Sequence, residues 1–405
     1  MNHEFLNFLV AAAIILVAAK LAGYLSIRLG QPSVLGELLA GLILGPTVLN
    51  MLGAWPLFAA DSHLSGALDL FAEIGVLLLM FLAGLELDLG ELLRSGRVAA
   101  LAGTFGVVVP LILGFTTAWL FGIGPIEALF VGLALSATSV SISAQTLMEL
   151  GVLRSTVGLG LLGAAVFDDI LVVLLLSIAS VVFGAGGEGN SLALIVVRMV
   201  LFLVGGSVVG LFVLPPLMRR MTRLAVSQAL PTAALVIALL YAWASEALGG
   251  VAAITGAFMA GLFLARTPYA HSIEGGIAAI AYSLFVPIFL VNIGLQANLR
   301  AISGEAWYLA IALTIVAIAS KVIGSGLGAL AGGFNRRDSL RLGVGMISRG
   351  EVGLIVGSVA LAASLVQRET FSEIVFMVIV ATLVTPPLLR LAYRNAPAST
   401  RQSAS

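Results

Sequence analysis

Apolar stretches of about 20 residues recur along the whole chain, separated by short breaks containing glycine, proline and arginine. A helix needs about 20 apolar residues to cross the hydrocarbon core of a bilayer. Of the 405 residues, 60% are hydrophobic and 10% are charged, against about 45–50% and about 25% in a soluble domain. We therefore expect an all-α polytopic membrane protein. Cysteine is absent, which excludes disulfides and cysteine-based metal sites.

The apolar stretches predict thirteen membrane-spanning helices, over residues 5–27, 33–51, 66–87, 98–121, 126–150, 158–183, 191–217, 226–247, 250–265, 277–297, 306–331, 339–364 and 371–392. The first stretch lacks a basic region before it and a small-residue cleavage site after it, so we expect a retained helix instead of a signal peptide. The polar residues 395–405 are expected to form a disordered tail.

The basic residues predict the orientation of these helices. With the N-terminus outside, the outer loops hold only Arg300 and Arg368. The inner loops and tail then hold Arg28, Arg94, Arg97, Arg154, Arg219, Arg220, Arg223, Arg266, Arg336, Arg337, Arg341, Arg390, Arg394 and Arg401. Short cytoplasmic loops collect lysine and arginine. This asymmetry predicts an external N-terminus and a cytoplasmic C-terminus. A missed helix would exchange the inner and outer sides of every later loop and so remove the asymmetry.

Short sequence matches recur in the same order in the two halves of the chain. Residues 36–44 match 256–264, residues 84–89 match 294–299, and residues 131–136 loosely match 342–348. The matched helices lie seven crossings apart, which is an odd number, so the two copies have opposite orientations. We predict two inverted six-helix repeats joined by a linker helix over 191–217, an arrangement typical of transporters. Chance similarity between glycine-rich helices is the alternative.

Polar stretches interrupt two predicted helices at equivalent repeat positions. Residues 135–143 contain five serines and threonines, and Ser348, Arg349, Gly350 and Glu351 follow one another within 339–364. Serine and threonine side chains can satisfy the backbone of an unwound segment. We therefore predict two crossed discontinuous helices, with Arg349 and Glu351 compensating the charges of the helix ends. Alternatively, the second helix begins later and both residues lie in an inner loop.

Two adjacent aspartates, Asp168 and Asp169, lie in the otherwise uncharged stretch 158–183. A carboxylate at membrane depth costs several kcal/mol unless it is paired, hydrated or neutral. Lys321, within 306–331, needs a carboxylate partner for the same reason. Consecutive helical residues diverge by about 100°, so one aspartate can pair with Lys321 while the other faces a water-filled cavity.

A partly desolvated carboxylate can hold a proton or an alkali cation, and the two compete for the same oxygens. Competition at one site together with alternating access produces cation/proton exchange. The alternative is a structural ion pair that only locks two helices together, which explains Asp168 and Lys321 but leaves Asp169 unexplained.

The remaining polar residues carry weaker indications. Glu37, Glu73 and Asn292 could line a cavity or serve helix ends and packing, and their roles stay open. The three histidines, His3, His63 and His271, lack metal-ligand spacing and are expected to be solvated. No catalytic triad or nucleotide-binding loop is present in the sequence, so we expect neither an enzyme nor a cofactor.

The sequence resembles the bacterial sodium/proton antiporters of the NapA type, within the monovalent cation/proton antiporter superfamily with its NhaA-like fold. The resemblance covers about residues 5–392 and is carried by residues 31–37, 137–140, 163–169, 321–324 and 349–356. It implies that Asp169 is the main carboxylate for Na⁺ and H⁺, that Asp168 pairs with Lys321, and that Thr138 and the adjacent Ser139 lie near the ion.

The resemblance also implies a homodimer in the bacterial cytoplasmic membrane that works by an elevator-like movement. Dimerisation-side helices are expected within 1–97 and 226–297, and core (transport) helices within 98–183 and 306–392. The Asp-Asp pair with its lysine resembles electrogenic exchangers of Na⁺ or Li⁺. The alternatives are a K⁺/H⁺ antiporter of the same family, a sodium-coupled organic-solute symporter, or a channel or sensor.

Overall fold

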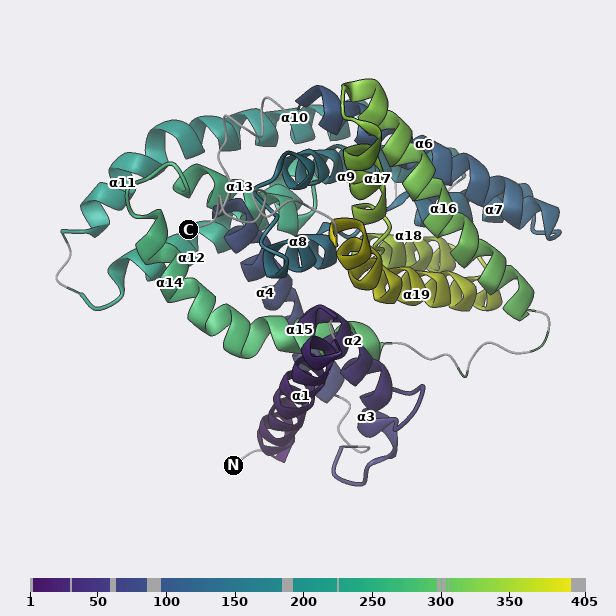
Figure 1. The fold of residues 1–405 in the computed structure, drawn as a ribbon, viewed down its shortest axis with the longest axis horizontal. Coiled ribbons are helices and arrows are strands. Elements are labelled where there is room, and N and C mark those ends of the chain that lie inside the picture. Colours follow the sequence, from purple (N-terminus) through teal and green to yellow (C-terminus); the bar gives the residue numbers. More distant parts are fainter. Residues whose placement is uncertain are drawn as a thin grey trace. The chain divides into compact units, whose positions relative to one another are not determined.

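The computed structural model describes residues 3–29, 31–58, 63–85, 96–183, 192–223, 226–296, 300, 304 and 306–394. Within these ranges every regular element is a helix (Figure 1). In chain order they are α1 His3–Arg28, α2 Ser33–Leu44, α3 Met51–Ala54, α4 Leu64–Leu85, α6 Gly96–Leu120, α7 Pro125–Ser136, α8 Val140–Glu149, α9 Thr156–Val182, α10 Leu192–Val208, η1 Val209–Val213, α11 Leu214–Met221, α12 Ala229–Ala244, η2 Ser245–Gly249, α13 Ala253–Leu264, α14 Ala270–Ile280, η3 Ala281–Phe285, α15 Val286–Leu295, α16 Ala306–Gly332, α17 Arg336–Gly345, α18 Glu351–Ala362 and α19 Arg368–Tyr393. The predicted tail, 395–405, lies outside the described residues.

Within the part of the chain that the structure describes, ten helical stretches are long and apolar enough to cross a membrane. Three shorter apolar helices accompany them, over Ser33–Leu44, Ala253–Leu264 and Val352–Leu361. The chain is therefore an all-helical polytopic membrane protein, as predicted. The count of thirteen spans and the inverted repeats stay predictions.

Several helix boundaries differ from the expected ones. Helix α2 ends at Leu44, because Gly45 adopts an extended conformation, and the short α3 follows it. The helix expected from residue 277 already begins at Ala270 and continues through the π-turn η3, which the polar residues before 277 concealed from an apolar pattern. Helix α17 begins at Arg336 because the Asn335 side chain caps it by accepting a hydrogen bond from the Asp338 backbone N–H at 2.9 Å.

The chain divides into two compact units. The first contains the described residues within 1–65, 95–188 and 290–405, and the second contains those within 66–94 and 189–289. The functional division into dimerisation and transport sides, and the linker role of 191–217, stay predictions.

In the second unit, two glycines bring the backbones of α4 and α13 together. A Cβ atom added at Gly84 would lie 2.2 Å from the Phe258 carbonyl oxygen, and one at Gly261 would lie 2.0 Å from the Phe81 carbonyl oxygen. Small residues allow such close approach between membrane helices.

In the first unit, helices α6, α7, α9, α16, α18 and α19 share an apolar core that includes Phe130, Leu313 and Met377. Helix α16 packs closely on α6 through glycines that recur every four residues. A Cβ atom at Gly324 would lie 2.5 Å from the Phe105 carbonyl oxygen, and one at Gly328 would lie 2.3 Å from that of Leu101. Lys321 lies one turn before this seam, so the packing of α16 on α6 positions its side chain.

We expect Gly328→Ala to destabilise the protein by about 1–3 kcal/mol, because the new methyl group overlaps the α6 backbone. Gly326→Ala, on the same helix, is the matched control, since its Cβ would meet its nearest neighbour, the Ser339 carbonyl oxygen, at 3.4 Å. That variant is expected to be neutral or slightly stabilising. Thermal unfolding in detergent compares the two, and equal melting temperatures would contradict the close packing.

Candidate functional site

Two of the helices in the first unit are interrupted inside the protein. Helix α7 ends at Ser136 and α8 begins at Val140, while α17 ends at Gly345 and α18 begins at Glu351. Arg349 is fully buried between α17 and α18. It is therefore not a residue of an exposed inner loop, which was the alternative to a break.

The two interruptions contact each other through backbone and hydroxyl groups. The Ser139 backbone N–H donates to the Ser348 carbonyl oxygen at 3.0 Å, and the Ser348 hydroxyl donates to the Ser139 carbonyl oxygen. The Ser143 hydroxyl donates to the Gly345 carbonyl oxygen at 2.5 Å. A Cβ atom at Gly350 would lie 2.6 Å from Ser139 Cβ, so glycine is needed there. These bonds satisfy backbone groups of Ser139, Gly345 and Ser348 that unwinding frees, as backbone at membrane depth requires.

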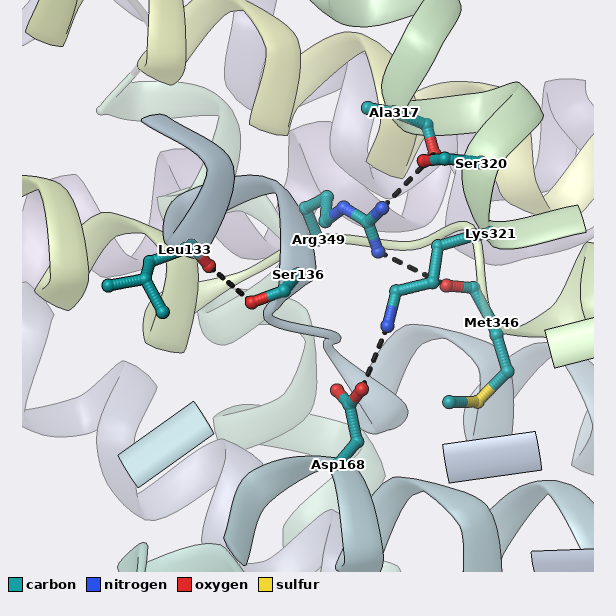
Figure 2. Close-up of polar contacts among 8 residues, drawn as sticks. All are labelled: Leu133, Ser136, Asp168, Ala317, Ser320, Lys321, Met346 and Arg349. Atoms are coloured by element: carbon teal, nitrogen blue, oxygen red, sulfur yellow. Dashed lines mark hydrogen bonds and ion pairs between the residues drawn. The ribbon is translucent and has the colours of Figure 1, made fainter. Parts of the chain in front are cut away.

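The buried ion pair of the site joins α9 to α16. Lys321 Nζ donates to Asp168 Oδ1 at 2.8 Å, and both side chains are fully buried (Figure 2). Two charges with no access to solvent are retained only when each has a partner. The structure thus pairs Lys321 with Asp168, the first aspartate of the two.

Arg349 compensates the end of α17 with its guanidinium group. It donates to the Met346 carbonyl oxygen at 3.3 Å and, from the other terminal nitrogen, to the Ala317 carbonyl oxygen of α16 at 3.1 Å (Figure 2). Carbonyl groups at a helix C-terminus carry partial negative charge, which a cation stabilises. Glu351 begins α18, and its side chain lies outside what the structure describes.

Asp169 follows the paired aspartate on α9 and is buried, with 5% of its surface exposed. Its carboxylate acts electrostatically on Lys321. Thr138 and Ser139, in the interruption between α7 and α8, are buried as well. Thr138 Oγ1 and Asp168 Oδ2 are both buried and have no hydrogen-bond partner among the described residues. The predicted site residues of α7–α9, α16 and the α17–α18 interruption therefore gather in one region.

Charges balance in this region. The described residues there contribute two carboxylates, Asp168 and Asp169, and two cationic groups, Lys321 and Arg349. Within the described residues there is no cluster of three or more His, Cys, Asp or Glu side chains that could hold a metal ion.

Thr382 of α19 is a site residue that the sequence did not indicate. Its hydroxyl donates to the Arg349 carbonyl oxygen, and it also lies 2.7 Å from the Val378 carbonyl oxygen in its own helix. A threonine inside an apolar helix normally bonds in this second way. No local signal in the sequence could have revealed the contact with Arg349.

The residues whose roles were left open lie in different places. Glu37 is buried on α2, Asn292 is buried on α15, and Glu73 is exposed on α4. His271 is exposed and lies 3.5 Å from Glu274, while nothing is described of the His3 side chain.

Comparison with known proteins places this architecture in a family. Residues 14–391 match the family described as "Sodium/hydrogen exchanger, transmembrane". The chain is 43% identical over 377 residues to a probable Na⁺/H⁺ antiporter, GerT, of Bacillus cereus, covering 93% of this chain and 97% of that protein. It is 40% identical over 387 residues to the Na⁺/H⁺-K⁺ antiporter GerN of Bacillus cereus, covering 96% of each.

A solved structure shares the fold. The sodium/proton antiporter MjNhaP1 from Methanocaldococcus jannaschii, determined at pH 8, superposes with a TM-score of 0.70 at 17% identity, covering 96% of this chain and 97% of that one. The match of the family over nearly the whole chain, and the high identity to curated relatives, agree with this likeness. This protein belongs to the transmembrane sodium/hydrogen exchanger family of monovalent cation/proton antiporters.

Proposed function

We propose that this protein exchanges Na⁺, and also Li⁺, for protons across the bacterial cytoplasmic membrane, with both ions competing for Asp169. The observation that carries the proposal is the buried Asp168–Lys321 pair at 2.8 Å, next to a second buried carboxylate. Because Lys321 already neutralises Asp168, the neighbouring Asp169 is the carboxylate left to exchange its cation. Thr138 and Ser139 supply oxygen atoms near it.

Alternating access completes the proposed mechanism. Interrupted helices offer polar backbone at membrane depth, where an ion can shed part of its hydration. We propose that α6–α9 and α16–α19 move as the transport side against a dimerisation side within a homodimer, with the N-terminus outside and the C-terminus in the cytoplasm. The distribution of arginines supports this orientation.

Exchange is tested in acidified proteoliposomes by adding sodium, lithium or potassium outside and following the internal pH. We expect sodium or lithium to drive proton release in the wild type and Asp169→Asn to abolish it. Asp338→Asn makes the same chemical change at the start of α17, away from the two interruptions, and is expected to retain exchange.

The other outcomes assign the alternatives. A response to potassium as well would support K⁺/H⁺ exchange, the second candidate, which the name of the relative GerN favours. If none of the three ions changes the internal pH of wild-type proteoliposomes, this result would contradict the antiporter and favour a sodium-coupled symporter of an organic solute.

A further inference from the structure

A polar contact joins the start of α2 to the end of α8 in the first unit. The Ser33 backbone N–H donates to Glu149 Oε2 at 2.8 Å, and the Ser33 hydroxyl donates to Glu149 Oε1. Helix α2 has Pro32 at its N-cap, which provides no side-chain hydrogen bond. Glu149 therefore supplies the negative group that a helix N-terminus favours.

Two buried side chains flank this contact. Glu37 lies one turn after Ser33 on α2, and Gln145 lies one turn before Glu149 on α8, so each shares a helix face with a residue of the contact. Only 5% of Glu37 and 7% of Gln145 is exposed. Among the described residues, neither Glu37 Oε2 nor Gln145 Oε1, both buried acceptors, has a hydrogen-bond donor.

The side-chain donors described near these two acceptors bond to other oxygen atoms. Lys20 of α1 reaches Glu37 Oε1 at 3.5 Å with a side chain that is 54% exposed. Gln145 Nε2 donates to Glu149 Oε1 at 3.4 Å. Reversing the Gln145 amide would not remove the deficit, because its oxygen would then face the Glu149 carboxylate. Among the described residues, Lys20 and Glu149 are the charged groups close enough to interact electrostatically with the Glu37 carboxylate.

A buried acceptor without a donor is destabilising, and here two of them flank one contact that already contains a second carboxylate. A positive particle removes the cost, since a proton on Glu37 can donate to an acceptor and an alkali ion can bind several oxygens together. Two carboxylates and one amide form a sparse ligand set, which suits a singly charged ion better than Ca²⁺ or Mg²⁺.

We propose that Glu37, Gln145 and Glu149 form a second site for a monovalent cation, separate from Asp169. Helix α8 connects the two places, because it starts beside Ser139 and ends at Glu149, about 15 Å further along its axis. Arg28 and Arg154, near the same helix ends, lie on the cytoplasmic side of the proposed topology. The second site would thus receive or release the exchanged cation on the cytoplasmic side. This role rests on the proposed function.

The test isolates this site by removing the central one. Purified Asp169→Asn protein in weakly buffered detergent solution is mixed with sodium, lithium, potassium or choline chloride, and a pH indicator reports proton release. An alkali ion at the second site would release protons from Asp169→Asn but not from Asp169→Asn/Glu37→Gln. Choline, whose methyl groups keep carboxylate oxygens away from its charge, should release none from either.

Infrared spectroscopy covers the case in which only a proton binds. A protonated-carboxyl band that titrates in Asp169→Asn, does not respond to sodium, and disappears with Glu37→Gln would identify the occupant as a proton. Glu373→Gln is the matched control, since Glu373 of α19 is another buried glutamate with an unpartnered Oε2. If Glu37→Gln alters neither signal, or only as Glu373→Gln does, the second site is ruled out.

A second variant protects the test against misfolding. Gln145→Glu adds a carboxylate beside Glu149 and should increase the protons bound per protein in the Asp169→Asn background, and an unchanged number would count against the site. The proton-release and infrared signals are measured on purified protein and do not require transport. Wild-type protein that fails to exchange ions in vesicles would contradict the proposed function while leaving the second site measurable.

Discussion

Replacing Lys321 by alanine is expected to destabilise the protein by about 3–5 kcal/mol, because it leaves the Asp168 carboxylate buried without its partner. The two atoms are 2.8 Å apart and neither side chain reaches solvent, so water cannot take over the role of the ammonium group. The melting temperature in detergent measures the effect. Asp168→Asn/Lys321→Ala should lose less stability than Lys321→Ala alone, since the uncompensated charge is then absent.

The chain offers a control, because its other lysine, Lys20, also lies in a membrane helix and also contacts a glutamate. That contact is longer, 3.5 Å, and the Lys20 side chain is about half exposed. Lys20→Ala is expected to cost less than about 1 kcal/mol. A melting temperature for Lys321→Ala that matches the one for Lys20→Ala would contradict a buried, stabilising pair.

The sequence indicated the polar centre of this protein because charge is rare in its apolar stretches. Asp168, Asp169, Lys321 and Arg349 stand out there, and a buried ammonium group requires a carboxylate. The spacing of the residues could not show which of the two aspartates pairs with Lys321, since the rotation of α9 about its axis depends on packing against its neighbours. That choice came from the family resemblance, and the structure places Asp168 opposite the lysine.

The interruptions were visible for a similar reason. Five serines and threonines in residues 135–143 can replace lost backbone hydrogen bonds, and the structure ends α7 at Ser136 within that stretch. The contacts across the interruptions could not be predicted, because they join residues about 200 positions apart. The bond from Thr382 to Arg349, 33 positions apart, and the contact of Ser33 with Glu149, 116 positions apart, also depend on tertiary packing and could not be predicted.

The positions of these residues do not by themselves establish their functional roles. Burial of Asp169 makes it a candidate for binding a cation, but exchange requires that the same carboxylate be reached from both sides of the membrane. This is why the vesicle experiment with Asp169→Asn tests more than the stability variants do. A stable Asp169→Asn protein without exchange would separate the cargo site from the scaffold.

Arg349→Ala is expected to destabilise the protein by an amount similar to the loss of Lys321, about 3–5 kcal/mol. The substitution removes the side-chain donor of the Met346 carbonyl oxygen and leaves the Ala317 carbonyl oxygen with the Ser320 hydroxyl at 3.3 Å as its side-chain donor. It also removes one of the two buried positive charges that balance Asp168 and Asp169. Arg349→Lys should recover only part of the stability, because an ammonium group lacks the planar fork that reaches two carbonyl groups together.

Arg300 provides the matched control for this prediction. It also donates to two backbone carbonyl oxygens, those of Thr47 at 3.0 Å and Val48 at 2.8 Å, but it is exposed. Water can satisfy those carbonyl groups after Arg300→Ala, so its melting temperature should change much less. Equal shifts for the two variants would show that burial of Arg349 between α17 and α18 adds nothing. A larger shift for Arg349→Ala would instead establish that the interrupted helix depends on a buried charge, because both variants remove an arginine that donates to backbone carbonyl groups.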